Sequence, residues 1–172
     1  MLPLIEWISQ TPLSLAIQTR DWVVPTIQSV HIAAIGIVVA SVFMIDLRVL
    51  GWAGRDQTLV ETVDRFGPWL SWALGVLLIT GALMVVGEPA RELLSFSFWL
   101  KMSLVALGTA IAVAFRIALR RNHQRWEESL VKRRTTRTLA VVTLFIWAGI
   151  IVLGRLIAYD HVWGSWSPAA RL

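Results

Sequence analysis

Three ionisable side chains lie within long apolar stretches of this sequence, and they are His31, Lys101 and Arg155. Charged and imidazole groups are costly in an apolar medium, so each is expected to have a partner or a function. A neutral imidazole can ligate haem iron, while ammonium and guanidinium groups pair with carboxylates. These residue types predict a polar site for a planar anionic cofactor or a quinone.

The stretches that must position these residues are four in number, at 23–45, 66–87, 93–119 and 138–159. Each has roughly the 20 residues that cross a bilayer as a helix. A lone span in lipid must satisfy its backbone hydrogen bonds internally, so these are expected to be helices. The fold class predicted is therefore all-α, an integral membrane four-helix bundle, with residues 1–172 as a single transmembrane domain.

The composition agrees with this prediction. Of the 172 residues, 56% are hydrophobic and 16% are charged, against about 25% charged in soluble domains. A disordered chain and a soluble enzyme of ordinary composition are thereby disfavoured. The absence of cysteine excludes disulfide scaffolds, thiolate metal sites, Fe–S clusters and cysteine nucleophiles.

The segment 2–18 is too short and too polar to span a bilayer. Its apolar residues alternate with polar ones, and Pro3 and Pro12 interrupt it. We expect an interfacial amphipathic segment with Trp7 at the level of the lipid head groups. A disordered tail is the alternative.

Basic residues predict the orientation of the spans. The loop after the third span is rich in them, the loop after the first carries Arg48, Arg55 and Arg65, and four spans put both loops on one side. The positive-inside rule makes this side cytoplasmic, so both termini are expected on the outer side of the membrane. Topology and anionic lipid account for the basic charge, so no nucleic-acid partner is predicted. The basic residues of the longer loop are Arg116, Arg120, Arg121, Arg125, Lys132, Arg133, Arg134 and Arg137.

The spacing places the three ionisable residues in the outer half of the bilayer. His31 and Lys101 each lie eight residues into a span entered from the outer side, roughly 12 Å deep at helical rise. Gln28 shares a helix face with His31, and Tyr159 follows Arg155 by one turn.

The predicted site would hold haem b or a quinone, with His31 as the metal ligand and Lys101 and Arg155 pairing the two haem propionates. A six-coordinate haem would need a second axial ligand, and the sequence has two further histidines. His161 is expected at the interface, and His123 is too far away in the cytoplasmic loop. The cofactor-binding set expected from the sequence is Gln28, His31, Lys101, Arg155 and Tyr159.

A simpler interpretation stands beside this one. Lys101 and Arg155 extend their side chains to the outer interface, and His31 forms a hydrogen bond with a neighbouring helix. Asp46 marks the inner end of the first span, where a carboxylate is unfavourable against the helix dipole. We therefore expect a cationic partner for it, either Arg65 or Arg116.

Several motifs follow one another in a recognisable order. They are Trp7-Ile8-Ser9-Gln10-Thr11-Pro12-Leu13, Asp46-Leu47-Arg48, Thr80-Gly81, Phe98 with Lys101, and Gly154-Arg155. This order resembles small bacterial four-helix membrane proteins of unknown function, the DUF6644 type, which implies a bacterial inner membrane with both termini in the periplasm. More distantly, the histidine of the first span and the lysine of the third resemble copper-resistance CopD-type proteins and HemJ-type protoporphyrinogen oxidases. The resemblance to the HemJ type implies a haem or porphyrin site at His31 and Lys101.

Two functions follow as hypotheses. The first is electron transfer through haem b or a quinone bound in the outer half of the bilayer. The second is a non-catalytic accessory or assembly subunit of a larger membrane complex, or a homo-oligomer, because small residues give the helices close-approach surfaces. No nucleophile–base pair, metal-ligand spacing or phosphate loop assigns an enzyme activity.

Overall fold

The computed structural model describes residues 2–121 and 134–159. Within these residues the chain is helical and contains no strand, as the sequence predicts. Four of the helices are long and apolar enough to cross a membrane, and the all-α membrane bundle is thereby confirmed. They are α3 (Val23–Leu50), α4 (Leu59–Gly87), α6 (Phe96–Arg121) and α8 (Arg134–Leu156), which continues into the 3₁₀ turn η1 (Ile157–Tyr159).

The ends of the helices differ from the ends of the expected spans because local capping, rather than hydropathy, determines where a helix begins and ends. Thr58 and Glu61 form a capping box, so α4 begins at residue 59 instead of 66. Gly51 adopts the left-handed conformation (φ 75°) that ends α3 five residues later than expected. At the start of α6 the backbone N–H of Phe98 donates to Oγ of Ser95 at 3.0 Å. The helix therefore begins at residue 96 rather than 93.

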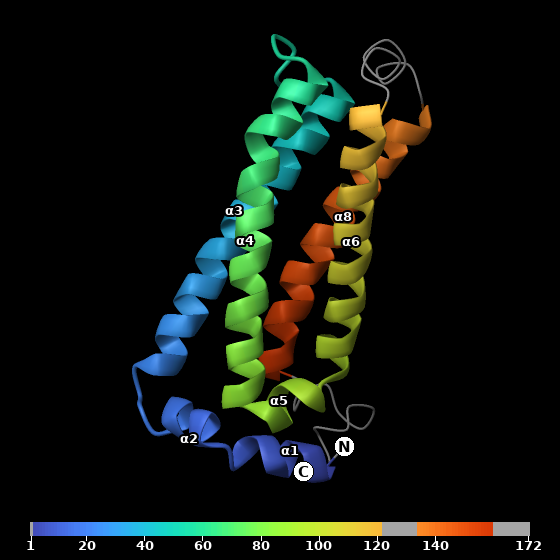
Figure 1. Cartoon of the computed structure of the whole chain (residues 1–172). Coiled ribbons are helices and arrows are strands. Elements are labelled where there is room, and N and C mark those ends of the chain that lie inside the picture. Colours follow the sequence, from blue (N-terminus) through green and yellow to red (C-terminus); the bar gives the residue numbers. More distant parts are fainter. Residues whose placement is uncertain (1, 122–133, 160–172) are drawn as a thin grey trace.

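The four long helices form two antiparallel pairs. Helix α3 packs mainly on α4, α6 packs mainly on α8, and α8 also contacts α3. Helices α4 and α6 barely touch, and Figure 1 shows α8 lying behind the space between them. The bundle is thus closed along three of its four interfaces.

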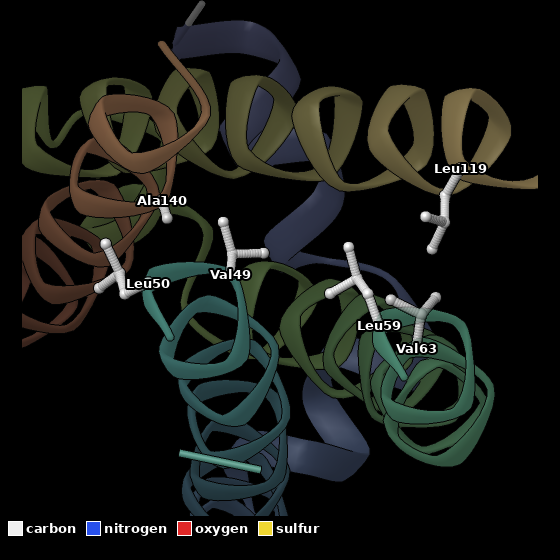
Figure 2. Packing of buried hydrophobic residues seen from close by; sticks show 6 residues of the cluster. All are labelled: Val49, Leu50, Leu59, Val63, Leu119 and Ala140. Carbon is white, nitrogen blue, oxygen red and sulfur yellow. The ribbon is translucent and has the colours of Figure 1, made fainter. Parts of the chain in front are cut away.

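One end of the bundle carries the turn 51–58, and we call it the basic end. A cluster of buried apolar side chains there contains residues from all four long helices (Figure 2). A second cluster lies nearer the middle, where Val38 of α3 and Trp147 of α8 are buried. The residues of the first cluster are Val49, Leu50, Leu59, Val63, Leu119 and Ala140.

Three short helices cover the opposite end, which we call the covered end (Figure 1). They are α1 (Leu2–Ser9), α2 (Pro12–Gln18) and α5 (Pro89–Leu93). The expected segment 2–18 is therefore helical, but the hydroxyl of Thr11 caps α2 and divides the segment in two. Ile5 and Ile17 are buried against the bundle, whereas Trp7 is 67% exposed.

The remaining residues include two positions considered above. His123 and most of the basic loop fall within 122–133, and His161 falls within 160–172. All of them lie outside the described residues.

Candidate functional site

His31 contacts a neighbouring helix through one ring nitrogen. Its Nδ1 lies 2.7 Å from Oγ1 of Thr80 in α4. The Thr80 hydroxyl has one proton. Its oxygen also lies 2.7 Å from the carbonyl oxygen of Val76 on the same helix. When that proton goes to the carbonyl, Thr80 accepts the proton of His31 Nδ1, and the neutral ring keeps an unprotonated Nε2. The hydrogen bond expected under the simpler interpretation is present.

Lys101 occupies the centre of a polar cluster near the covered end. Its ammonium group is close enough to act electrostatically on His31 of α3 and on Glu92 of α5. Its Nζ also lies 5.4 Å from the centre of the Phe98 ring. The Lys101 cluster, defined as His31, Thr80, Glu92 and Lys101, therefore joins four separate helices.

Glu92 is a member of this cluster that the sequence interpretation missed. It lies in the short helix α5 and is only 4% exposed. Burial raises the pKa of its carboxyl group above the ordinary value, although the charges of Lys101 and Arg91 oppose this effect. The sequence analysis gave Glu92 no role, because it lies between the expected spans 66–87 and 93–119.

The other predicted site residues lie apart from this cluster. The guanidinium of Arg155 donates to the Tyr159 hydroxyl at 3.2 Å and lies 5.3 Å from the centre of its ring. Both contacts are made at the exposed surface where α8 continues into η1. The neighbouring Gly154 instead faces the cluster, since a Cβ there would lie 3.7 Å from Cδ of Lys101.

Gln28 lines a small cavity of about 10 Å³ with residues of α2 and α4. This volume is about that of one water molecule. Gln28 is one turn from His31 on α3, as expected from the sequence, but the cavity has no room for a planar cofactor.

A second polar contact lies near the basic end. The Thr143 hydroxyl of α8 is 2.8 Å from Oδ2 of Asp46 in α3. The expected cationic partner of Asp46 is not found among the described residues. Arg65 lies over the Phe66 ring at 5.6 Å, and the Arg116 guanidinium lies against Gly67 of α4. A hydroxyl donor therefore takes the place expected for a cation.

No group of three or more potential metal-ligating residues occurs in the part of the chain that the structure describes. A haem needs only one protein nitrogen, so this finding does not bear on His31 as a haem ligand.

Comparison with known proteins adds a family but no activity. A family model described as "Family of unknown function (DUF6644)" matches residues 4–160. No curated protein and no solved structure matches the chain. The more distant likeness to CopD-type and HemJ-type proteins therefore stays an expectation. The match covers nearly the whole sequence, from the first short helix to the end of the fourth long one, and the chain belongs to this DUF6644 family.

Proposed function

We propose that the protein binds the head group of a quinone at the Lys101 cluster and takes part in electron transfer within the membrane. The observation that supports this is the convergence of Lys101, His31 and Glu92 from three different helices near one end of the bundle. A quinone offers two carbonyl oxygens that accept hydrogen bonds. The ammonium group of Lys101 supplies donors, and the ring of His31 supplies a site for a proton.

The Thr80 contact prepares His31 for this role. When Thr80 accepts the proton of Nδ1, the contact fixes the orientation of the ring and leaves Nε2 available to a ligand. Reduction of a quinone to a quinol takes up two electrons and two protons. In this proposal a separate redox protein of the same membrane supplies or removes the electrons, and His31 and Glu92 are the nearby groups that exchange protons.

Haem b fits the described residues less well. His31 retains one free ring nitrogen for an axial bond, but its Cε1 lies 3.6 Å from the place of a Cβ on Gly81, so this edge of the ring faces α4. The cavity beside Gln28 measures about 10 Å³, whereas pockets for ligands of drug size or larger have several hundred Å³. The cavity beside Gln28 therefore has no space for a macrocycle, and we derive no chemistry through haem.

The experiment is to purify the full-length protein in a mild detergent from membranes that contain quinones. Bound quinone is extracted with organic solvent and quantified by chromatography against protein concentration. Visible spectra of the oxidised and dithionite-reduced protein are recorded on the same sample. We expect about one quinone per protein and no Soret band.

Two variants locate the ligand. Lys101→Met removes the ammonium group while keeping a side chain of similar length, and it should lose most of the quinone. Arg120→Met on the same helix removes an exposed cation that pairs with Asp64 at the basic end, and it should retain the quinone. Quinone-free protein that takes up no added quinone, or equal retention by both variants, contradicts the proposal. A Soret band with reduced α and β bands would replace the quinone by haem b.

An accessory subunit predicts a different outcome for the same preparation. Trp69 and Trp72 of α4 are 62% and 78% exposed, and in a membrane such rings contact lipid or another protein. The accessory function predicts no bound quinone and a stoichiometric partner that co-purifies from gently solubilised native membranes.

A further inference from the structure

A cleft near the basic end is independent of the Lys101 cluster. It has a volume of about 110 Å³, and all four long helices line it. It is partly open, and α4 and α6, the two lining helices that barely touch, leave the side of the bundle open there. Its walls are mostly apolar, formed by residues such as Leu70, Ala112 and Trp147.

Among the described residues, two ionisable side chains line this apolar cleft, Asp46 and Arg116. Asp46 is 7% exposed, and its Oδ2 is in contact with Thr143. Its other oxygen, Oδ1, has no hydrogen-bond partner within residues 2–121 and 134–159. A carboxylate oxygen that lines a cavity in this way can accept a hydrogen bond from a ligand.

Within the described residues, Arg116 lacks the polar partners that two other arginines of this end have. Arg120 pairs with Asp64 at 3.5 Å, and Arg48 donates to the carbonyl oxygen of Gln57 at 2.7 Å. Arg116 makes no hydrogen bond or ion pair with any residue that the structure describes. Its Cζ lies 3.7 Å from the place of a Cβ on Gly67, so the side chain reaches from α6 to α4. A half-buried guanidinium beside apolar walls favours an anion with several oxygen acceptors.

We propose that this cleft binds an anionic glycerophospholipid whose head group carries a hydroxyl. Arg116 pairs with the phosphate, Asp46 accepts the hydroxyl, and part of an acyl chain lies between α4 and α6. A quinone head group has only acceptors, so it offers Asp46 no donor and leaves Arg116 without a charged partner. The volume is too small for a second helix but takes one head group or one segment of chain.

The charge of this end of the bundle supports the same ligand. Other cations lie on the described helices near the basic end, and they include Arg48, Arg65, Arg120 and Arg121. Cations near a membrane surface attract anionic lipid. These four cations concentrate anionic lipid nonspecifically, whereas Arg116 and Asp46 select one molecule of it.

The test uses the full-length protein in detergent with phosphatidylglycerol and phosphatidylcholine of identical acyl chains as probes. Native mass spectrometry measures the affinity for the first bound lipid. We expect phosphatidylglycerol to bind about tenfold more tightly than phosphatidylcholine, because only it offers both a net negative phosphate and a donor hydroxyl. Glycerol phosphate at millimolar concentration should not displace the lipid, which separates a lipid head group from a free phosphate ester as the ligand.

Three variants make the test specific. Arg116→Gln should abolish the preference for phosphatidylglycerol, while Arg120→Gln on the same helix should keep it. Ala112→Phe fills the cleft without changing any charge and should weaken binding of both lipids. Circular dichroism and size-exclusion chromatography establish that each variant is folded, and Ala112→Phe remains informative where Arg116→Gln fails to fold.

Three results would overturn the proposal. The first is equal affinity of the wild-type protein for the two lipids. The second is equal loss of the preference in Arg116→Gln and Arg120→Gln, which indicates general charge attraction. The third is undiminished binding by folded Ala112→Phe.

Discussion

The hydroxyl of Thr143 lies 2.8 Å from Oδ2 of Asp46 and joins α8 to α3 across 97 residues of sequence. The same hydroxyl is 2.8 Å from the carbonyl oxygen of Ala140 and 3.0 Å from that of Leu139. The single proton of the Thr143 hydroxyl thus has three acceptors within reach. In one arrangement Thr143 donates this proton to an ionised Asp46. In the other, Thr143 donates it to a carbonyl oxygen of α8, and a protonated Asp46 donates to Thr143. Either arrangement holds the two helix pairs together.

We predict energetic coupling between Asp46 and Thr143. Asp46→Ala and Thr143→Ala should each destabilise the protein, and the double variant should lose about 1 kcal/mol less than the sum, in the range measured between membrane helices. The free energy of unfolding is measured by titrating detergent-solubilised protein with dodecyl sulfate. Thr62→Ala is the control, because the Thr62 hydroxyl donates to the carbonyl oxygen of Thr58, the residue that caps α4, and not to another helix. Additive effects of Asp46→Ala and Thr143→Ala would refute the coupling.

Ser14 attaches the short helix α2 to the end of α4. Its hydroxyl is fully buried, donates to the Val86 carbonyl oxygen at 2.7 Å and accepts from Gln18 at 2.9 Å. Ser14→Ala leaves a carbonyl of the last turn of α4 without this donor and should cost about 1–3 kcal/mol. Ser9→Ala removes a hydroxyl that bonds only within α1 and should cost less. The same unfolding titration compares the two, and equal stability of both variants contradicts this role.

Gly87 allows α2 to approach α4 closely. A Cβ at this position would lie 2.8 Å from Cγ2 of Ile17, and Ile17 is buried. Gly87→Ala should therefore destabilise the protein by about 1–3 kcal/mol through overpacking. Gly75→Ala is the matched control in the same helix, since nothing lies within 4 Å of its added Cβ. Limited proteolysis of residues 2–18 offers a second measurement, and it should accelerate only in Gly87→Ala.

Glu92 should make the stability depend on pH. Burial raises the pKa of its carboxyl group above the ordinary 4.5, so the folded chain binds more protons than the unfolded chain above that pH. Stability contributed by the protonated group is then complete below about pH 4.5 and is lost as the pH rises through the higher pKa of the folded state.

The measurement is the thermal unfolding midpoint of wild type and of Glu92→Gln between about pH 4.5 and pH 7. The midpoint of the wild type should fall more steeply with rising pH. Glu6→Gln removes one carboxylate from exposed α1 at the same end and should follow the wild type. Parallel curves for wild type and Glu92→Gln would exclude this contribution.

The orientation expected from the basic residues can be tested by labelling, because the chain has no cysteine. Asp21 before α3 and Asp56 in the turn after it are both exposed and lie at opposite ends of the bundle. In intact spheroplasts a membrane-impermeant maleimide should label Asp21→Cys, and it should label Asp56→Cys only after lysis. The opposite pattern inverts the proposed topology.

Hydropathy was sufficient to predict the four long helices, because the cost of exposing a backbone to lipid leaves few alternatives. It could not predict that α4 begins seven residues before the expected span, since the capping box of Thr58 and Glu61 extends the helix into polar sequence. A separate helix at 89–93 was also not predicted. Its five residues are too few for a periodic pattern to be recognised.

The polar contacts could be predicted only in part. His31 and Lys101 stand out as ionisable groups in apolar stretches, and the structure brings them within electrostatic range of each other. Their hydroxyl and carboxylate neighbours were not identified. A threonine such as Thr80 or Thr143 can always bond its own helix, so only the rotation of two packed helices decides whether it also meets a partner. The prediction that Arg65 or Arg116 pairs with Asp46 was wrong for the same reason.

The weak contact between α4 and α6 means that, in cross-section, the four helices form an incomplete ring. The fourth wall of the cleft is then made of hydrocarbon, and the surrounding bilayer acts as a structural component of the bundle. A molecule already dissolved in the membrane can reach Asp46 and Arg116 by diffusing sideways in two dimensions, without passing through water. If the cleft binds lipid as proposed, the chemical identity of the nearest lipids becomes part of what determines how firmly the two helix pairs hold together.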